Sequence, residues 1–153
     1  KAGTSLEPKL ISLKGVSVTG LKIIHHPKGD VLHALKCSED SFEGFGEAYF
    51  TTVYKDELKG WKQHIRMTMN LVVPVGEVGF HFHNQELSKS VFLRVGQSNY
   101  VRITVQPGIW MAFQGLAADL NLVLNIGNIP HDPTEAINSW IGSFPLGKVN
   151  GPE

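Results

Sequence analysis

Residues 64–84, HIRMTMNLVVPVGEVGFHFHN, decide the fold class because apolar and polar residues alternate along them with a period of two. In the first half, one set of alternate positions is apolar: Ile65, Met67, Met69, Leu71 and Val73. The other set is polar: His64, Arg66, Thr68 and Asn70. This period is typical of a strand with two different faces. The segment therefore predicts short strands rather than helices.

Similar short segments with alternating apolar and polar residues lie on both sides of this one. Further candidate strands are VSVTGLKII (16–24), EGFGEAYFTTVY (43–54), KSVFLRVG (89–96), NYVRITVQPG (99–108) and ADLNLVLNIG (118–127). Glycine, asparagine or proline closes most of them, as expected for turns. Short strands at regular intervals with few helices between them predict an all-β fold, an antiparallel sandwich or barrel.

One segment, DPTEAINSWIG (132–142), predicts a short C-terminal helix. Asp132 is the expected N-cap, Pro133 occupies the first helical position, and Glu135 completes a capping box. An apolar stripe at helical spacing follows, formed by Ile137, Trp140 and Ile141.

Length and charge limit the function classes. The chain has 153 residues, which suits one domain covering 1–153. Fourteen basic residues balance fourteen acidic ones, which argues against a nucleic-acid or membrane-surface partner. The single cysteine, Cys37, excludes an internal disulfide. The low cysteine content suggests a reducing compartment, so we expect a cytoplasmic protein. No apolar run reaches the ~18–20 residues that span a bilayer.

The segment ELKGWKQH (57–64) concentrates reactive side chains beside a buried strand. A lysine on a water-poor wall, Lys59 or Lys62, can act as a base or stay charged and stabilise an enolate oxygen. The alternative, which matches the usual behaviour of lysine, is that both are solvated at a strand entrance. The polar set beginning with His64 and Arg66 lines a pocket if the fold is a barrel, and faces solvent if it is a sandwich.

His81 and His83 lie two residues apart, so both imidazoles leave the same face of their strand. With Glu86 or His64 they could ligate one divalent metal. The alternative is a polar pair on the face of the strand without a metal.

Taken in order, several segments resemble the dTDP-4-dehydrorhamnose 3,5-epimerase family, an RmlC-like group of cupin-type jelly rolls. LKGWKQH is similar to the family's L-R-G-L-H-x-Q, and VQPGIWMAFQG to its I-P-x-G-F-A-H-G-F. LVVPVGEVGFHFHN and NIPHDPTEAINSW resemble two further family segments. The resemblance extends from about Val16 to Trp140.

The resemblance implies a cupin-type homodimer that needs no metal or organic cofactor and binds a nucleotide sugar. Family members invert carbons 3 and 5 of a 4-keto sugar in deoxysugar and cell-surface polysaccharide biosynthesis. A histidine paired with an aspartate removes a proton next to the carbonyl, a tyrosine returns one, and a lysine holds the enolate.

Carried over to this chain, the family's catalytic set is altered. Lys62 stands where the base histidine is expected, and His64 follows two positions later. The partner aspartate falls at Asn128, or at Ile129 if the one-residue gap is placed elsewhere, and the tyrosine falls near Leu124. The substrate-binding arginine becomes Lys59, which keeps the charge but not the planar fork.

We therefore expect an isomerase related to this epimerase, with Lys62 or His64 as its base. The residues expected to bind substrate are Lys59, Arg66, Tyr54, Trp110, Asn128 and His131. The alternatives are a sugar-nucleotide-binding member without activity, and a metal-dependent cupin that uses His81 and His83.

Overall fold

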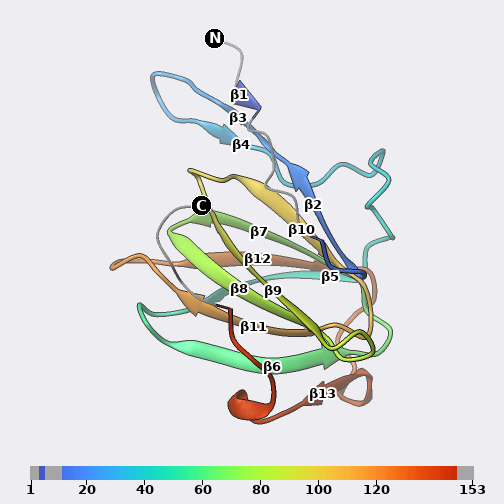
Figure 1. Cartoon of the computed structure of the whole chain (residues 1–153). Helices are drawn as coiled ribbons and strands as arrows, with labels where there is room; N and C mark the ends of the chain where they lie inside the picture. The colour runs from blue at the N-terminus through green and yellow to red at the C-terminus, as the bar shows by residue number, and fades with distance from the viewer. Residues whose placement is uncertain (1–3, 6–11, 148–153) are drawn as a thin grey trace.

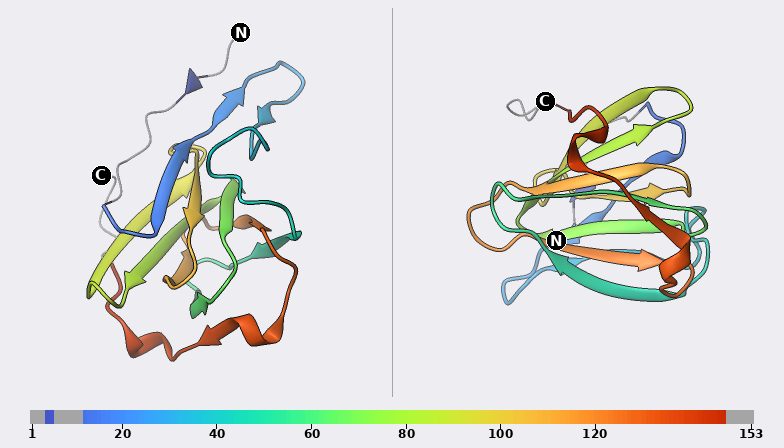
Figure 2. Two further views of the ribbon diagram at one scale, coloured as in Figure 1. Left: turned by 90° about the vertical axis from the view of Figure 1, so that its right-hand side faces the viewer. Right: turned by 90° about the horizontal axis from the view of Figure 1, so that it is seen from below.

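The computed structural model describes residues 4–5 and 12–147, and within them the fold is all-β, as the sequence predicts. Two five-stranded antiparallel sheets face each other (Figures 1 and 2). The first contains, in spatial order, β2 (Val16–Gly20), β10 (Val101–Val105), β7 (Met69–Val75), β12 (Leu122–Gly127) and β5 (Glu47–Thr52). The second contains β13 (Ala136–Asn138), β6 (Leu58–His64), β11 (Trp110–Gly115), β8 (Glu77–Asn84) and β9 (Lys89–Gly96).

A small third sheet stands off one end of the two large ones (Figure 1). It consists of β1 (Thr4–Ser5), β3 (Lys22–Ile24) and β4 (Val31–Leu32). No helix in the described part of the chain is long and apolar enough to cross a membrane.

The main core fills the space between the two large sheets. Alternate residues of the predicted strands supply it, including Phe80 and Phe82 on β8 and Val101 and Ile103 on β10, all of them fully buried. The rings of Phe80 and Phe82 stack with their centroids 6.0 Å apart. This alternation puts the residues between them on the outer face of the sheet.

The predicted single strand over residues 64–73 is wrong. β6 ends at His64, β7 begins at Met69, and the two strands belong to different sheets. In the bend between them, the backbone N–H groups of Arg66 and Met67 donate to the carboxylate of Glu135, and that of Thr68 donates to a side-chain amide. These side-chain partners replace the strand neighbours that a continuous ladder would need.

The predicted C-terminal helix is also wrong. Asp132 does cap a turn, because its Oδ1 accepts from Thr134 N at 2.9 Å, but the turn is a 3₁₀ helix of three residues, Pro133–Glu135. The chain then extends into β13, which pairs with β6. The side chain of Glu135 points into the protein instead of closing a capping box. Pairing with an open sheet edge and burial of this carboxylate outweigh helix propensity.

Candidate active site

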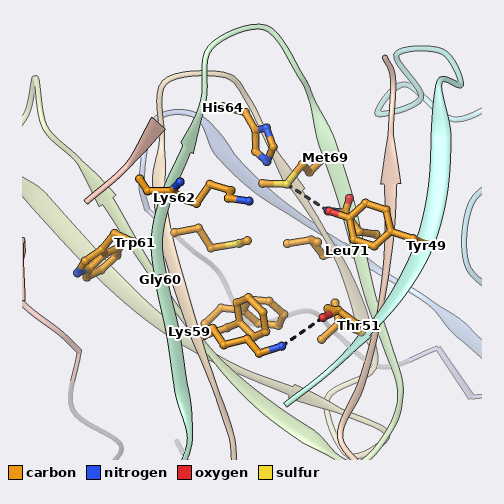
Figure 3. Close-up of a pocket in the computed structure, with 15 residues that line it drawn as sticks. Tyr49, Thr51, Lys59, Gly60, Trp61, Lys62, His64, Met69 and Leu71 are labelled. Carbon is orange, nitrogen blue, oxygen red and sulfur yellow. Dashed lines mark hydrogen bonds between the residues drawn. The ribbon is translucent and has the colours of Figure 1, made fainter. Parts of the chain in front are cut away.

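A β-bulge in β6 gives the site its cations. Two residues of β6, Gly60 and Trp61, lie opposite one residue of β11, Ala112. An extra residue on one strand shifts the alternation of side chains by one position. Lys59 and Lys62, three positions apart, therefore both line the same pocket (Figure 3).

The indole ring of Trp61 lies on the outer side of β6, on the other side of the strand from the lysine side chains (Figure 3). It is 1% exposed, and its Nε1 donates to the carbonyl of Ile141 at 2.8 Å. The ring of Phe144 packs edge-on against it, with centroids 5.5 Å apart. The indole thus anchors the C-terminal segment on the back of the strand that carries the lysines.

The pocket has a volume of about 440 Å³ and lies where the two sheets separate, between β5 and β6. Lys59, Lys62 and His64 on β6 face Tyr49 and Thr51 on β5 across it (Figure 3). The apolar floor is continuous with the core and includes Met69, Leu71, Phe80 and Met111. A mostly apolar hollow with a few convergent polar groups is the usual form of a small-molecule site.

His64 and Glu135 form a buried pair at one end of the pocket. Nδ1 of His64 makes a short hydrogen bond to Oε1 of Glu135. β13 places the carboxylate there, because Ala136 pairs directly with His64. With Nδ1 bonded to the carboxylate, Nε2 is the nitrogen left to exchange a proton with a ligand.

The carboxylate of Glu135 is kept ionised. Burial raises its pKa, but the hydrogen bond from His64 and the bonds from Arg66 N and Met67 N, at 3.2 Å each, outweigh burial. The net effect is a pKa below the usual value for a glutamate. An ionised carboxylate that accepts from Nδ1 fixes the tautomer of His64.

Tyr49 places a phenol on the opposite wall. Its phenol oxygen accepts a hydrogen bond from Nδ2 of Asn125 at 2.9 Å. Burial raises the pKa of Tyr49, so the phenol is protonated at neutral pH. One wall of the pocket therefore carries an imidazole paired with a carboxylate, and the other carries a protonated phenol.

The two lysines differ in their contacts. Nζ of Lys59 donates to the carbonyl of Thr52 at 2.7 Å and lies 5.9 Å from the ring centroid of Phe113. This hydrogen bond connects β6 in one sheet to β5 in the other. Nζ of Lys62 has no hydrogen bond or ion pair to any described residue. Lys62 is the lysine available to a ligand.

Five of the residues predicted to bind substrate do not line this pocket. Arg66 forms an exposed ion pair with Asp132, 2.8 Å between Nη2 and Oδ2. Oδ1 of Asn128 accepts from a backbone N–H in the bend after β6. Trp110 packs on the outer face beside Trp61.

The remaining two, Tyr54 and His131, are exposed side chains outside the pocket. Tyr54 is 76% exposed. Lys59, Lys62 and His64 are the predicted residues that the structure brings together.

His81 and His83 face outward from β8 and have partners other than a metal. Nε2 of His81 bonds Oε1 of Gln114 at 2.7 Å, and its Nδ1 accepts from Gly147 N at 2.9 Å. His83 bonds Oγ of Ser90 at 2.6 Å and stacks on Phe144. No group of three or more His, Cys, Asp or Glu residues is arranged to hold a metal within the described residues. These contacts do not favour the metal-dependent alternative.

Three site residues were missed from the sequence: Tyr49, Asn125 and Glu135. The period-two pattern of EAYFTT puts Tyr49 and Thr51 on one face, which is a usable signal. The period-two pattern of LVLNIG likewise puts Asn125 on the same face as Val123. No local sequence pattern identifies Glu135 as a site residue, because its position depends on the pairing of β13 with β6.

Comparison with solved structures finds a similar fold in several sugar isomerases and epimerases. A dTDP sugar isomerase from Desulfovibrio desulfuricans G20 is 29% identical, with a TM-score of 0.83 over 88% of this chain and 90% of that one. QdtA, a sugar 3,4-ketoisomerase from Thermoanaerobacterium thermosaccharolyticum in complex with TDP, is 18% identical, with a TM-score of 0.72 over 84% and 90%.

A third similar structure is dTDP-6-deoxy-D-glucose-3,5-epimerase RmlC from Legionella pneumophila Philadelphia 1, in complex with dTDP-4-keto-L-rhamnose. It is 15% identical, with a TM-score of 0.76 over 90% of this chain and 82% of that one. No family model matches the sequence, and no curated protein matches it.

Both the sheet topology and these similarities define one fold: the chain has an RmlC-like, cupin-type fold. It is the fold of enzymes that modify dTDP-linked deoxysugars.

Proposed function

We propose that the chain is an isomerase that acts on a dTDP-linked 4-keto-6-deoxy sugar by removing a proton next to the carbonyl. The observation that carries the proposal is the His64–Glu135 pair, which faces Tyr49 across a pocket that Lys62 also lines, without a hydrogen bond or ion pair to any described residue. Proton abstraction beside a carbonyl is the first step of both epimerisation and keto-group migration, so the proposal covers either product.

In this proposal Nε2 of His64 takes the proton from carbon. The C–H electron pair moves into a carbon–carbon double bond, and the carbonyl oxygen becomes an enolate oxygen. Glu135 stabilises the imidazolium that results. Nζ of Lys62 stabilises the negative charge that develops on the enolate oxygen.

Tyr49 then donates its proton to carbon from the opposite wall. The C–H bond forms with the enolate electron pair, and the phenolate is reprotonated from solvent, into which His64 releases the proton it took. A base and an acid on opposite walls allow the proton to leave one face and return on the other. The apolar floor suits the methyl group of a 6-deoxy sugar.

The roles differ from the sequence-based expectation in one respect. That expectation had an altered catalytic pair, with Lys62 or His64 as base and Asn128 in place of the carboxylate. The geometry favours His64 as the base, with Glu135 as the carboxylate and Lys62 as a cation. A histidine that lines the pocket and is paired with a buried carboxylate is also the feature that favours an enzyme over a member that only binds.

The test is solvent exchange. The protein is incubated with dTDP-4-keto-6-deoxyglucose in deuterium oxide, and NMR follows deuterium at carbons 3 and 5 and the identity of any product. We expect exchange, and a ~10²–10⁴-fold loss in His64→Asn. His131→Asn, an exposed histidine outside the pocket, is the matched control and should exchange at the wild-type rate.

Absence of exchange at high protein concentration, with related keto sugars also inert, would overturn the proposal. Binding of dTDP by calorimetry in that case would establish the alternative, a sugar-nucleotide-binding protein without activity.

A further inference from the structure

Asn125, on β12 beside Tyr49, has an unusual pattern of hydrogen bonds. Its side chain is 5% exposed and lines the pocket. Nδ2 donates to two acceptors, the phenol oxygen of Tyr49 at 2.9 Å and Sδ of Met69 at 3.4 Å. Oδ1 is buried and has no hydrogen-bond partner among the described residues.

The contact with Met69 favours this orientation of the amide. A thioether sulfur only accepts hydrogen bonds, so an N–H group and not an oxygen belongs against it. Both N–H groups of Asn125 are then used, and the unpaired oxygen carries a cost in free energy. Buried unpaired groups are uncommon, and each needs an explanation.

The orientation has a direct consequence for Tyr49. Because its oxygen accepts from Asn125, its own O–H hydrogen is not used in that bond. No described residue accepts this hydrogen. With the amide reversed, Oδ1 would take the hydroxyl hydrogen and hold it away from a ligand.

We propose that Asn125 is a positioning residue for Tyr49: its N–H keeps the hydroxyl hydrogen available to the substrate and stabilises the phenolate after the proton has left. The proposal rests on the proposed function, because it assumes that Tyr49 is the acid. It adds a residue that acts through Tyr49 and does not itself exchange a proton.

The charges around Tyr49 support this role. Burial raises the pKa of Tyr49, and the carboxylates of Glu47 and Glu135 raise it further. The hydrogen bond from Asn125 is the contribution that lowers it. Without Asn125, the phenolate that must form during each turnover would have no donor among these neighbours.

Two variants test the proposal. Asn125→Leu removes the donor, and Asn125→Asp keeps the shape but accepts the hydroxyl hydrogen. In deuterium oxide His64 can still remove a proton and return deuterium to the same face. We expect product formation to fall ~10–100-fold while this same-face exchange falls by less than about threefold. The ratio of exchange to product therefore rises, as it should in the limiting variant Tyr49→Phe.

A purely structural role would lower exchange and product together, and that result, or an unchanged ratio, would overturn the proposal. A second measurement does not need turnover. With ¹³C at the tyrosine Cζ, and Tyr49 assigned from Tyr49→Phe, Asn125→Leu should raise the titration midpoint of Tyr49 by more than ~0.5 pH unit.

The two measurements separate the possible failures. Exchange in the wild type with no shift of the Tyr49 midpoint in Asn125→Leu refutes the role of Asn125 and leaves the proposed function standing. No exchange in the wild type refutes the proposed function and the catalytic role of Asn125 with it, whatever the midpoint does.

Discussion

At the scale of single residues, the carboxylate of Glu135 has two tasks. It orients His64, and it accepts the N–H groups of Arg66 and Met67, which fixes the bend that follows β6. One side chain therefore connects the proposed base to the local fold. Removing its charge should affect the two tasks differently.

Glu135→Gln should lower kcat ~10²–10⁴-fold with little change in KM, because an amide facing Nδ1 no longer fixes the tautomer or stabilises the imidazolium. Steady-state kinetics on dTDP-4-keto-6-deoxyglucose measures this. The matched control, Glu86→Gln, removes an exposed carboxylate outside the pocket and should behave as wild type. A kcat close to wild type in Glu135→Gln would remove the carboxylate from the mechanism.

Lys62→Met should lower kcat by about 10²-fold, because the enolate oxygen loses its cation in an apolar pocket. Lys62→Arg, which keeps the charge, should recover part of the loss. Lys89→Met changes an exposed lysine on β9 and is the control. If Lys62→Met raised KM alone, the lysine would bind substrate without stabilising the enolate.

At the scale of elements, the bulge in β6 determines which side chains enter the pocket. Gly60 permits it: its φ is +144°, and a Cβ there would lie 2.5 Å from Cβ of Ala112 and 2.7 Å from its Cα. Only glycine tolerates both this positive φ and the close approach of Ala112. The positions of Lys59 and Lys62 thus depend on one residue with no side chain.

Gly60→Ala should lower the free energy of unfolding by about 2–3 kcal/mol, from backbone strain and the contact with Ala112 together. Gly44→Ala is the matched control: φ there is +110°, but nothing lies within 4 Å of the added Cβ, so only strain remains. Urea denaturation compares the two variants. Equal losses would show that the close approach to β11 contributes nothing.

At the scale of the whole molecule, buried titratable groups make stability depend on pH. Burial lowers the pKa values of His81 and His83, so both are neutral in the folded protein. The unfolded chain binds protons at these positions as the pH falls below about 6.5, and the folded protein binds them only at lower pH. Protonation therefore favours unfolding in that range.

A second loss should follow at lower pH. Burial raises the pKa values of Glu39 and Glu135, but hydrogen bonds from Arg102 and His64 reverse this and hold both below 4.5. Their contribution to the free energy of unfolding is complete above the pKa of a glutamate in the unfolded chain. It is lost as the pH falls through their lower pKa values in the folded protein. We expect the free energy of unfolding in urea to decline in two stages between pH 8 and pH 3. The first stage should be smaller in His81→Gln, and a flat profile from pH 8 to 5 would contradict the prediction.

The homodimer implied by the family resemblance stays a prediction. β5 lies at the end of its sheet, and the aromatic residues Phe45, Phe50 and Tyr54, in or beside it, are 66%, 63% and 76% exposed. Burying them against a second copy would remove apolar surface from water. Light scattering should give twice the chain mass of 16.9 kDa, and a monomer at micromolar concentration would contradict it.

The sequence alone determined the fold class and the strand that carries the cations. Period-two alternation is a local property, because side chains of a strand point to opposite faces whatever the strand pairs with. It located β8, β9, β10 and β12 closely, and the ELKGWKQH segment contains three residues of the pocket.

The tertiary structure alone decided which groups meet. The sequence predicts that Glu135 caps a helix. In the structure it is the partner of His64, 71 residues away along the chain, because β13 pairs with the edge of β6. The bulge at Gly60 shifts the alternation of side chains along β6 by one position. The outward-facing His81 and His83 form hydrogen bonds to residues of other segments. These contacts join residues far apart in the sequence, and local periodicity has no information on register or on which strand edge remains free.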